Sequence, residues 1–172
     1  HLLPAETLEY AAEHRVTHLT GVPPLFHQLA ATDWPEALRE SMRSFASTGG
    51  VMPVALTRRL QALMPRARGF LMYGFTEAFR ATILPSGELE RRPDSIGLPI
   101  PGAELHVLRA DGTACAPGEA GELVQAGALV AQGYWGDDEH AADKFRCLPP
   151  GIDPARPRAV WSGDIVHRDA DG

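Results

Sequence analysis

Lysine is almost missing from this chain. Lys144 is the one lysine among 16 basic residues, and these face 22 acidic residues, so the formal net charge is −6 over 172 residues. Proteins that bind nucleic acid usually carry a clustered basic surface, and this composition offers none. The sequence also holds no apolar run close to the roughly 20 residues that a membrane-spanning helix needs. We therefore expect neither a nucleic-acid partner nor a membrane span.

Cysteine is also scarce. Cys115 and Cys147 lie far apart in the sequence and do not form the closely spaced pairs that bind zinc. Because no signal peptide is visible, we interpret them as reduced thiols of a cytoplasmic protein. The remaining composition, 44% hydrophobic and 22% charged, is that of an ordinary globular protein. A chain of this length suits one domain or two small lobes.

Residues 1–95 alternate between predicted helices and strands. Prolines mark three helix starts, because the fixed φ of proline suits the first turn, at positions 4, 23 and 53. Short apolar runs predict strands at 16–22, 44–48 and 69–73. Strands separated by helices imply a parallel sheet, and such sheets bind ligands at the carboxyl ends of their strands. We therefore predict an α/β lobe with a partial parallel sheet and flanking helices.

Residues 96–172 have a different character, with many glycines and prolines. Short strands are predicted at 104–109, 121–125, 130–134 and 160–168. Turn sequences such as Ala110–Gly112 separate them, so we predict a small, distorted antiparallel β-barrel lobe. A charged helical stretch over 138–145 carries Lys144, which we interpret as a solvated surface residue. The fold class predicted for the whole chain is therefore α/β, with the β-barrel-like lobe second.

The polar stretch Tyr73–Glu77, which reads YGFTE, follows directly from a predicted strand. Gly74 allows the backbone to turn sharply or to approach a ligand closely, because it has no Cβ. An aromatic ring, a hydroxyl and a carboxylate within five residues suit a nucleotide, which offers a base, a phosphate and its magnesium. The alternative interpretation is a strand end followed by an ordinary polar turn.

Two further stretches suit the same ligand. In Ser162–Asp164 the carboxylate follows a glycine, so it can accept hydrogen bonds from both hydroxyls of a ribose. Charged hydrogen bonds of this kind are worth roughly 1.5–3 kcal/mol each. Thr48–Gly50 carries a glycine pair, which exposes backbone amides and lets a flat ligand lie against the chain. Gly-Asp is also a common turn, and the glycine pair lacks the spacing and the lysine of a P-loop.

Together these motifs resemble the adenylate-forming enzymes: acyl-CoA synthetases, acyl-AMP ligases, luciferases and nonribosomal adenylation domains. The matching motifs are, in order, Thr48-Gly49-Gly50, Tyr73-Gly74-Phe75-Thr76-Glu77, Gly121-Glu122-Leu123 with Gly127 and Gly133-Tyr134-Trp135, and Ser162-Gly163-Asp164. The resemblance covers essentially the whole chain and is greatest for bacterial fatty-acyl-CoA ligases. The residues 78–80 and 92–97 are similar to a subgroup linked to exopolysaccharide and exosortase gene clusters.

The resemblance implies a role for individual residues. Tyr73 would stack on the adenine, and the glycine pair would present backbone to the same ring and to the acyl group. Thr76 would bind the α-phosphate, Glu77 would hold Mg²⁺, and Asp164 would bind both ribose hydroxyls. Thr76 and Glu77 are the implied catalytic residues. The implied nucleotide-binding residues are Thr48, Gly49, Gly50, Tyr73, Gly74, Phe75, Thr76 and Asp164.

The implied reaction has two steps. The carboxylate of an acid, expected to be a fatty acid, attacks the α-phosphorus of ATP and gives acyl-AMP and pyrophosphate. Coenzyme A, as co-substrate, then accepts the acyl group as a thioester. An acyl carrier protein is the alternative acceptor. A non-catalytic nucleotide-binding or scaffold module that retains the fold is the alternative to an enzyme.

The sequence also departs from the family pattern. Leu71 stands where relatives often have an amide side chain, and Ser162 replaces the usual threonine. The family's phosphate loop ending in a lysine does not occur, nor does the C-terminal lid with its catalytic lysine. The charged groups that would stabilise the transition state are therefore missing. We expect a fragment of the large domain of a longer enzyme, inactive alone, with lobes at 1–95 and 96–172.

Overall fold

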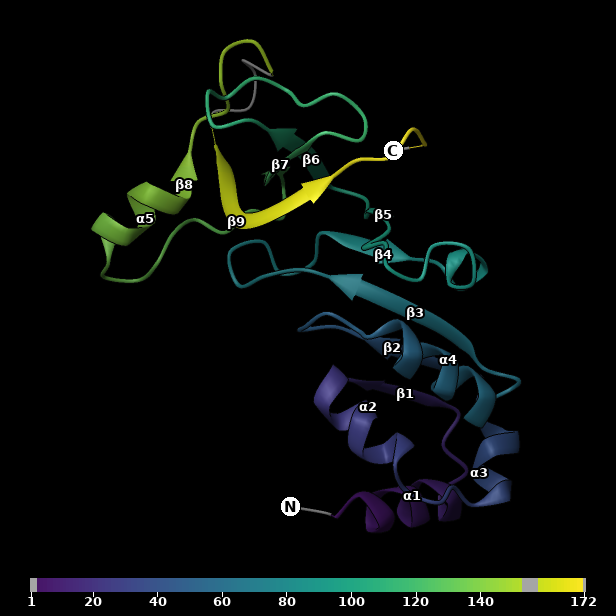
Figure 1. The fold of residues 1–172 in the computed structure, drawn as a ribbon. Coiled ribbons are helices and arrows are strands. Elements are labelled where there is room, and N and C mark those ends of the chain that lie inside the picture. Colours follow the sequence, from purple (N-terminus) through teal and green to yellow (C-terminus); the bar gives the residue numbers. More distant parts are fainter. Residues whose placement is uncertain (1–2, 153–157, 172) are drawn as a thin grey trace. The chain divides into compact units, whose positions relative to one another are not determined.

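A computed structural model describes residues 3–152 and 158–171 (Figure 1). The chain forms two compact units. The first comprises the residues up to Tyr73 together with Ile83–Gly97, and the second comprises Gly74–Thr82 together with the residues from Leu98 onward. The segment Gly74–Thr82 thus packs with the second unit, although it precedes residue 95. The division of the parent protein into lobes at residue 95 stays a prediction.

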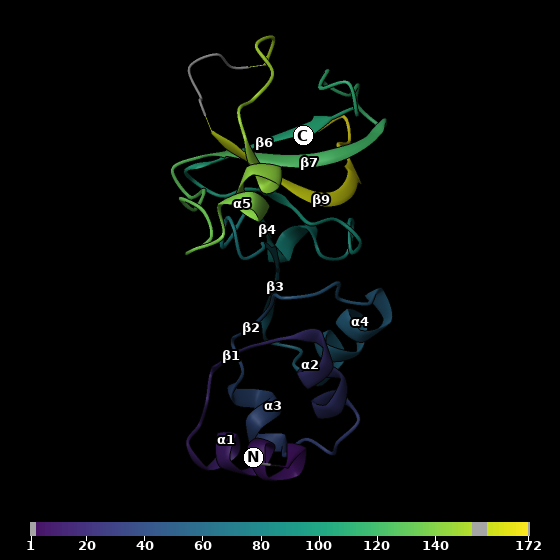
Figure 2. The same cartoon turned by 90° about the vertical axis from the view of Figure 1, so that its left-hand side faces the viewer.

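The first unit is built on three parallel strands, as the alternation of helices and strands predicts. They are β1 (His18–Gly21), β2 (Ser44–Ser47) and β3 (Arg68–Tyr73). Four helices accompany them: α1 (Pro4–Glu13), α2 (Pro23–Ala30), α3 (Glu36–Ser41) and α4 (Val54–Leu63). Helices α2 and α4 pack together and lie on the same side of the strands (Figure 2). Strand β4 (Thr82–Leu84) and the 3₁₀ turn η1 (Ser86–Glu88) are short, and the two-residue strand β5 (Leu98–Pro99) belongs to the second unit.

Proline marks the helix starts much as predicted. Pro4 and Pro23 are the first residues of α1 and α2, where their missing N–H groups have no helical partner to lose. Pro53 instead caps α4, which begins at Val54. Helix α3 was not predicted, because six residues are too few to show a helical repeat of apolar positions.

Two aromatic rings form the centre of the first core. Phe26 of α2 and Phe45 of β2 are both fully buried, and their rings meet edge to face at 6.0 Å and 65°. Gly69 of β3 lies directly against Phe45, since a Cβ at position 69 would come within 2.5 Å of that ring. A glycine here lets β3 lie in register beside β2, so that the two strands end at the same edge of the sheet.

The second unit contains a curled, four-stranded antiparallel sheet. Its strands are β6 (Ala103–Leu108), β7 (Ala120–Gly127), β8 (Phe145–Arg146) and β9 (Ala159–His167), in the order β6-β7-β9-β8. The charged helix α5 (Asp138–Lys144) packs against β8 and β9. Buried side chains from three of the strands form its core together with Leu148. The predicted class, a parallel α/β part followed by a distorted antiparallel β part, is confirmed.

One predicted strand is wrong. Residues 130–134 form no strand, although their sequence alternates like one. The backbone N–H of Ala131 donates instead to the carbonyl of Glu77, at 2.7 Å, which belongs to a loop rather than to a strand ladder. Gly133, with φ of 149°, lies in a backbone region that other residues rarely adopt. The segment is therefore a connection between β7 and α5.

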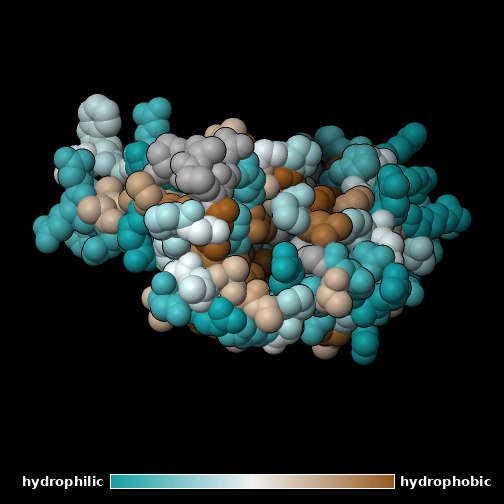
Figure 3. Space-filling model, turned by 90° about the horizontal axis from the view of Figure 1, so that it is seen from above, coloured by the Kyte–Doolittle hydropathy of each residue, from teal (hydrophilic) through white to brown (hydrophobic). Residues whose placement is uncertain are grey.

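The surface of the protein carries many charged residues. Figure 3 shows hydrophilic side chains over much of one face, with hydrophobic ones gathered between them. Within the residues that the structure describes, no helix combines the length and apolar character needed to cross a bilayer.

Candidate functional site

The first unit brings the ends of its strands to one edge. Gly21 of β1 pairs with Ser47 of β2, and Ser47 pairs with Leu71 of β3. The N–H of Thr48 donates to the carbonyl of Gly21, at 3.2 Å, and so continues this ladder by one residue. Since the strands are parallel and in register, the glycine pair after β2 and Tyr73 at the end of β3 lie at the same edge of the sheet. That is the edge at which sheets of this kind bind ligands.

The glycine pair at this edge is open to solvent. Gly49 and Gly50 are exposed, and Thr48 is half-buried. Gly49 has φ of 78°, in the left-handed region that a residue with a side chain adopts only at a cost. A Cβ at this position would also press on Val22, at 3.3 Å. The backbone here is therefore both accessible and held in a glycine-specific turn, as a surface for a flat ligand requires.

The segment Gly74–Thr82 forms a tight loop within the second unit. A Cβ at Gly74 would come within 2.1 Å of the carbonyl oxygen of Phe79, so only glycine allows this closure. The N–H of Ala78 donates to the carbonyl of Phe75, at 3.2 Å, and closes the turn between them. Thr76, in that turn, is exposed, whereas Glu77 is half-buried. Thr76 and Glu77 are therefore adjacent residues of one closed loop.

Glu77 is held by two contacts from the connection between β7 and α5. The hydroxyl of Tyr134 donates a hydrogen bond to Oε1 of Glu77, and Ala131 donates its N–H to the Glu77 carbonyl. The hydrogen bond to the carboxylate, followed by desolvation, raises the pKa of Tyr134 above its ordinary value. The phenol therefore stays protonated and acts as a donor throughout the neutral range.

Glu77 has a carboxylate oxygen that could bind a Mg²⁺ ion held by the phosphates of a nucleotide. Tyr134 uses only Oε1, and among the described residues Oε2 accepts no hydrogen bond. Among the residues that the structure describes, no three or more histidine, cysteine, aspartate or glutamate side chains form a cluster that could hold a metal ion. Magnesium commonly takes one or two carboxylates and completes its shell with phosphate oxygens and water. One carboxylate oxygen at Glu77 fits that pattern.

Asp164 lies on a sharply turned part of β9. Gly163 before it has φ of 84°, and the pairing of β7 with β9 shifts register between Glu122 and Val124. The N–H of Asp164 donates to Oγ of Ser162, at 3.0 Å, and that hydroxyl donates to the carbonyl of Leu123, at 2.8 Å. These bonds form a bulge in the pairing of β7 with β9, and Asp164 at this bulge is exposed.

Two charged side chains support this bulge. The carboxylate of Glu122 accepts a hydrogen bond from the N–H of Gly163, at 3.1 Å. The ammonium of Lys144 donates to the carbonyl of Ser162, at 3.2 Å, and Lys144 is half-buried. The interpretation of Lys144 as a solvated surface residue is therefore wrong. Its partner was not visible in the sequence because Ser162 lies 18 residues away, on β9.

The predicted site residues are divided between the two units. Those of the first unit are Thr48, Gly49, Gly50 and Tyr73, and those of the second are Gly74, Phe75, Thr76, Glu77 and Asp164. Each group is positioned within its own unit by the contacts described above. That both groups meet around one nucleotide stays a prediction.

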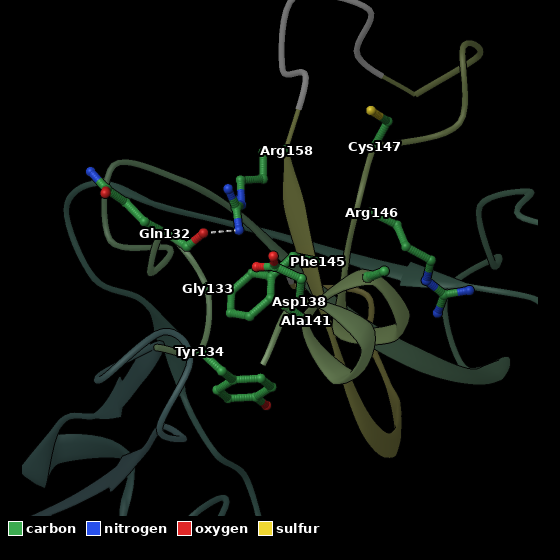
Figure 4. A pocket seen from close by; sticks show the side chains of 10 residues that line it. Gln132, Gly133, Tyr134, Asp138, Ala141, Phe145, Arg146, Cys147 and Arg158 are labelled. Carbon is green, nitrogen blue, oxygen red and sulfur yellow. Dashed lines mark hydrogen bonds between the residues drawn. The ribbon is translucent and has the colours of Figure 1, made fainter. Parts of the chain in front are cut away.

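The second unit also contains a pocket that the sequence did not indicate (Figure 4). Its volume is about 430 Å³, and it is lined by Gln132, Gly133, Tyr134, Asp138, Ala141, Ala142, Phe145, Arg146, Cys147 and Arg158. Arg158 donates to the carbonyl of Gln132 and lies over the ring of Phe145, 4.7 Å from its centroid. None of the predicted site residues lines this pocket. Tyr134 connects it to Glu77.

The chain matches a family model described as "AMP-binding enzyme" over residues 1–135. Among curated proteins, a probable non-canonical nonribosomal peptide synthetase, CymA of Salinispora arenicola, is 39% identical over 94% of this chain and 2% of its own length. Feruloyl-CoA synthase of an Amycolatopsis species is 30% identical over 98% of this chain and 32% of its own length. This chain thus spans only a minor part of each relative.

A solved structure supports the same relationship. The crystal structure of VinN superposes with a TM-score of 0.80 and 32% sequence identity, covering 95% of this chain and 40% of VinN. The match includes both the parallel α/β part and the curled antiparallel sheet. The family model also includes the stretch Tyr73–Glu77 and the Tyr134 segment within its 135 residues. The chain belongs to the AMP-binding, adenylate-forming family of ligases.

Proposed function

We propose that this chain is part of a longer AMP-forming ligase, which uses ATP to activate a carboxylic acid as its acyl-AMP. The observation that carries the proposal is the loop Gly74–Thr82, which lies inside the family match and holds Glu77 with one carboxylate oxygen unoccupied by hydrogen bonds from the described residues. A fold shared with relatives would not by itself assign an activity, because folds host many functions. A hydroxyl and a carboxylate on adjacent residues of this loop suit a phosphate-bearing ligand and its metal ion.

In the proposed reaction, an oxygen of the substrate carboxylate bonds to the α-phosphorus of ATP. The bond from that phosphorus to the bridging oxygen breaks, and pyrophosphate leaves with the electron pair. The Thr76 hydroxyl donates to the α-phosphate, and Asp164 accepts hydrogen bonds from the two ribose hydroxyls. Glu77 would hold Mg²⁺, which would supply positive charge to the phosphates. The ring of Tyr73 stacks on the adenine, which contributes about 1–3 kcal/mol whatever the base.

The acceptor of the acyl group has two candidates. We propose coenzyme A and a fatty acid, which the resemblance to fatty-acyl-CoA ligases favours, and the relative named feruloyl-CoA synthase supports the choice of coenzyme A. Loading of a carrier protein is the second candidate, because a nonribosomal peptide synthetase is the more identical of the two relatives. Both of this chain's cysteines are free thiols in the structure. Because free thiols suit a reducing compartment, we propose that the enzyme works in the cytoplasm.

Pyrophosphate exchange tests the first step. The full-length protein should return labelled pyrophosphate to ATP when supplied with its acid, across a panel of fatty and aromatic acids. The 172-residue chain alone should show no exchange, because its one lysine is bound to the Ser162 carbonyl and no second one exists to neutralise phosphate charge. Exchange by the chain alone would show that the missing lysines are dispensable.

Thioester formation then tests the acceptor. Supplying coenzyme A or a phosphopantetheinylated carrier protein to the full-length enzyme should yield product with only one of them. A full-length protein that binds ATP but shows neither exchange nor thioester with any acid would support the scaffold module instead.

A further inference from the structure

Tyr134 is the side chain that bonds directly to the proposed metal ligand. Its hydroxyl donates to Oε1 of Glu77, while the backbone of Ala131 in the same segment holds the Glu77 carbonyl, at 2.7 Å. Residues 130–134, which form no strand, therefore bind Glu77 through two hydrogen bonds. Because this segment pairs with no strand, the N–H of Ala131 is available to donate to Glu77.

The ring of Tyr134 is itself held in place by packing against Phe145. It meets the ring of Phe145 edge to face, with centroids 5.6 Å apart at 72°. Phe145 is covered on its other side by the guanidinium of Arg158, which also donates to the carbonyl of Gln132, two residues before Tyr134 (Figure 4). The phenol is thus aimed at Glu77 by contacts to both its ring and its backbone neighbour.

We propose that Tyr134 is a positioning residue, which fixes Oε1 of Glu77 and leaves Oε2 to bind the metal ion of the nucleotide complex. This inference rests on the proposed function of Glu77. A free glutamate side chain samples many rotamers, and a metal that binds it must order it first. A phenol already bonded to one oxygen removes part of that cost, as groups that orient metal ligands commonly do.

The chemistry of the site favours a Tyr134 that orients the Glu77 carboxylate over one that competes with the metal ion for it. A tyrosine hydroxyl occupies one of the carboxylate's two oxygens, and it carries no charge that would repel a cation. A lysine or arginine at the same place would neutralise Glu77 and oppose metal binding. Phenylalanine at position 134 would keep the contact with Phe145 and lose only the donor, which makes the hydroxyl separable from the packing.

The test compares Tyr134→Phe with Glu77→Gln and a matched control, Tyr10→Phe, in the full-length protein. Tyr10 is an exposed tyrosine on α1, and its ring stacks on His14. ATP affinity is measured by calorimetry with Mg²⁺ present and with EDTA, and Mn²⁺ binding to the ATP complex is followed by electron paramagnetic resonance. We expect Tyr134→Phe to weaken metal binding about 10-fold, the lower end for loss of an orienting partner, with metal-free ATP affinity unchanged. Tyr10→Phe should leave both values unchanged.

The other outcomes separate the two proposals. Unchanged or tighter Mn²⁺ binding in Tyr134→Phe, with Glu77→Gln impaired, would overturn the role of Tyr134 and keep that of Glu77. Normal metal dependence in Glu77→Gln would remove the proposed metal ligand itself. In the double variant, Tyr134→Phe should add no further loss once Glu77 is changed, because the hydroxyl acts through the carboxylate. Equal loss of metal-dependent and metal-free affinity, with a lowered unfolding temperature, would make Tyr134 a purely structural residue and overturn the inference.

Discussion

Lys144 donates a hydrogen bond to the carbonyl of Ser162, 18 residues further along the chain, at 3.2 Å. The contact ties helix α5 to the bulge that presents Asp164. A Cβ at Gly163 would lie 3.4 Å from the Lys144 ammonium, so the side chain packs closely over the turn. The one lysine of this chain therefore has a structural partner beside the proposed ribose-binding residue.

Replacing Lys144 should loosen that bulge. Lys144→Met keeps the aliphatic stem and removes the donor, and we expect ATP affinity of the full-length protein to fall about 5-fold. This corresponds to roughly 1 kcal/mol, the value for a hydrogen bond that is partly exposed to solvent. Lys144→Arg retains a donor and should remain near wild type. Equal affinities for the methionine variant and the wild type would show that the bulge holds without this contact.

Asp164 provides the direct test of ribose recognition. Asp164→Ala should raise the KM for ATP at least about 100-fold, because two charged hydrogen bonds are lost and each is worth roughly 1.5–3 kcal/mol. The matched control is Asp33→Ala, which removes an exposed aspartate of the first unit. Steady-state kinetics with varied ATP would check this. Unaltered ATP kinetics in Asp164→Ala would refute the assignment.

Gly69 should tolerate no side chain. Gly69→Ala would place a methyl group 2.5 Å from the buried ring of Phe45, and the ring cannot move without disturbing the packing of Phe26. We expect the free energy of unfolding to fall by about 1–3 kcal/mol, as overpacking of a core usually costs. Gly87→Ala is the control, since nothing lies within 4 Å of its added Cβ. Urea denaturation of both variants measures the difference, and equal midpoints would contradict the tight contact.

Glu119 should stabilise the second unit in a pH-dependent way. Its carboxylate receives two hydrogen bonds from Arg109 and one from the N–H of Ala116, at 3.0 Å, and these hold the pKa of Glu119 below its ordinary value of 4.5. A depressed pKa means that the unfolded state binds the proton more readily. The stabilisation is therefore complete above the ordinary value and is lost as the pH falls through the folded pKa.

The prediction concerns the difference between wild type and Glu119→Gln. The variant should be less stable at neutral pH, and the two unfolding temperatures should converge as the pH is lowered below 4.5. Glu90→Gln removes an exposed carboxylate and serves as the control. A difference that stays constant from pH 7 to pH 3 would mean that the ion pair with Arg109 does not contribute.

Several elements could be predicted because their causes are local. Pro4 and Pro23 begin helices through their fixed φ, and the apolar run at 69–73 forms β3, which starts one residue earlier. The edge shared by Gly49 and Tyr73 follows from helices between strands, which require a parallel sheet. The prediction failed at 130–134, where an alternating pattern has no neighbouring strand to pair with.

The linear order of residues was enough for the fold class, because proline, glycine and apolar periodicity act over a few neighbours. The family followed from the resemblance of four motifs in the right order. The partners of Glu77 and of Ser162 came only from the folded chain. Tyr134 lies 57 residues from Glu77, and Lys144 lies 18 from Ser162, so no local pattern connects them. A hydrogen bond between such residues depends on how β7, α5, β8 and β9 pack, and packing is a property of the whole unit.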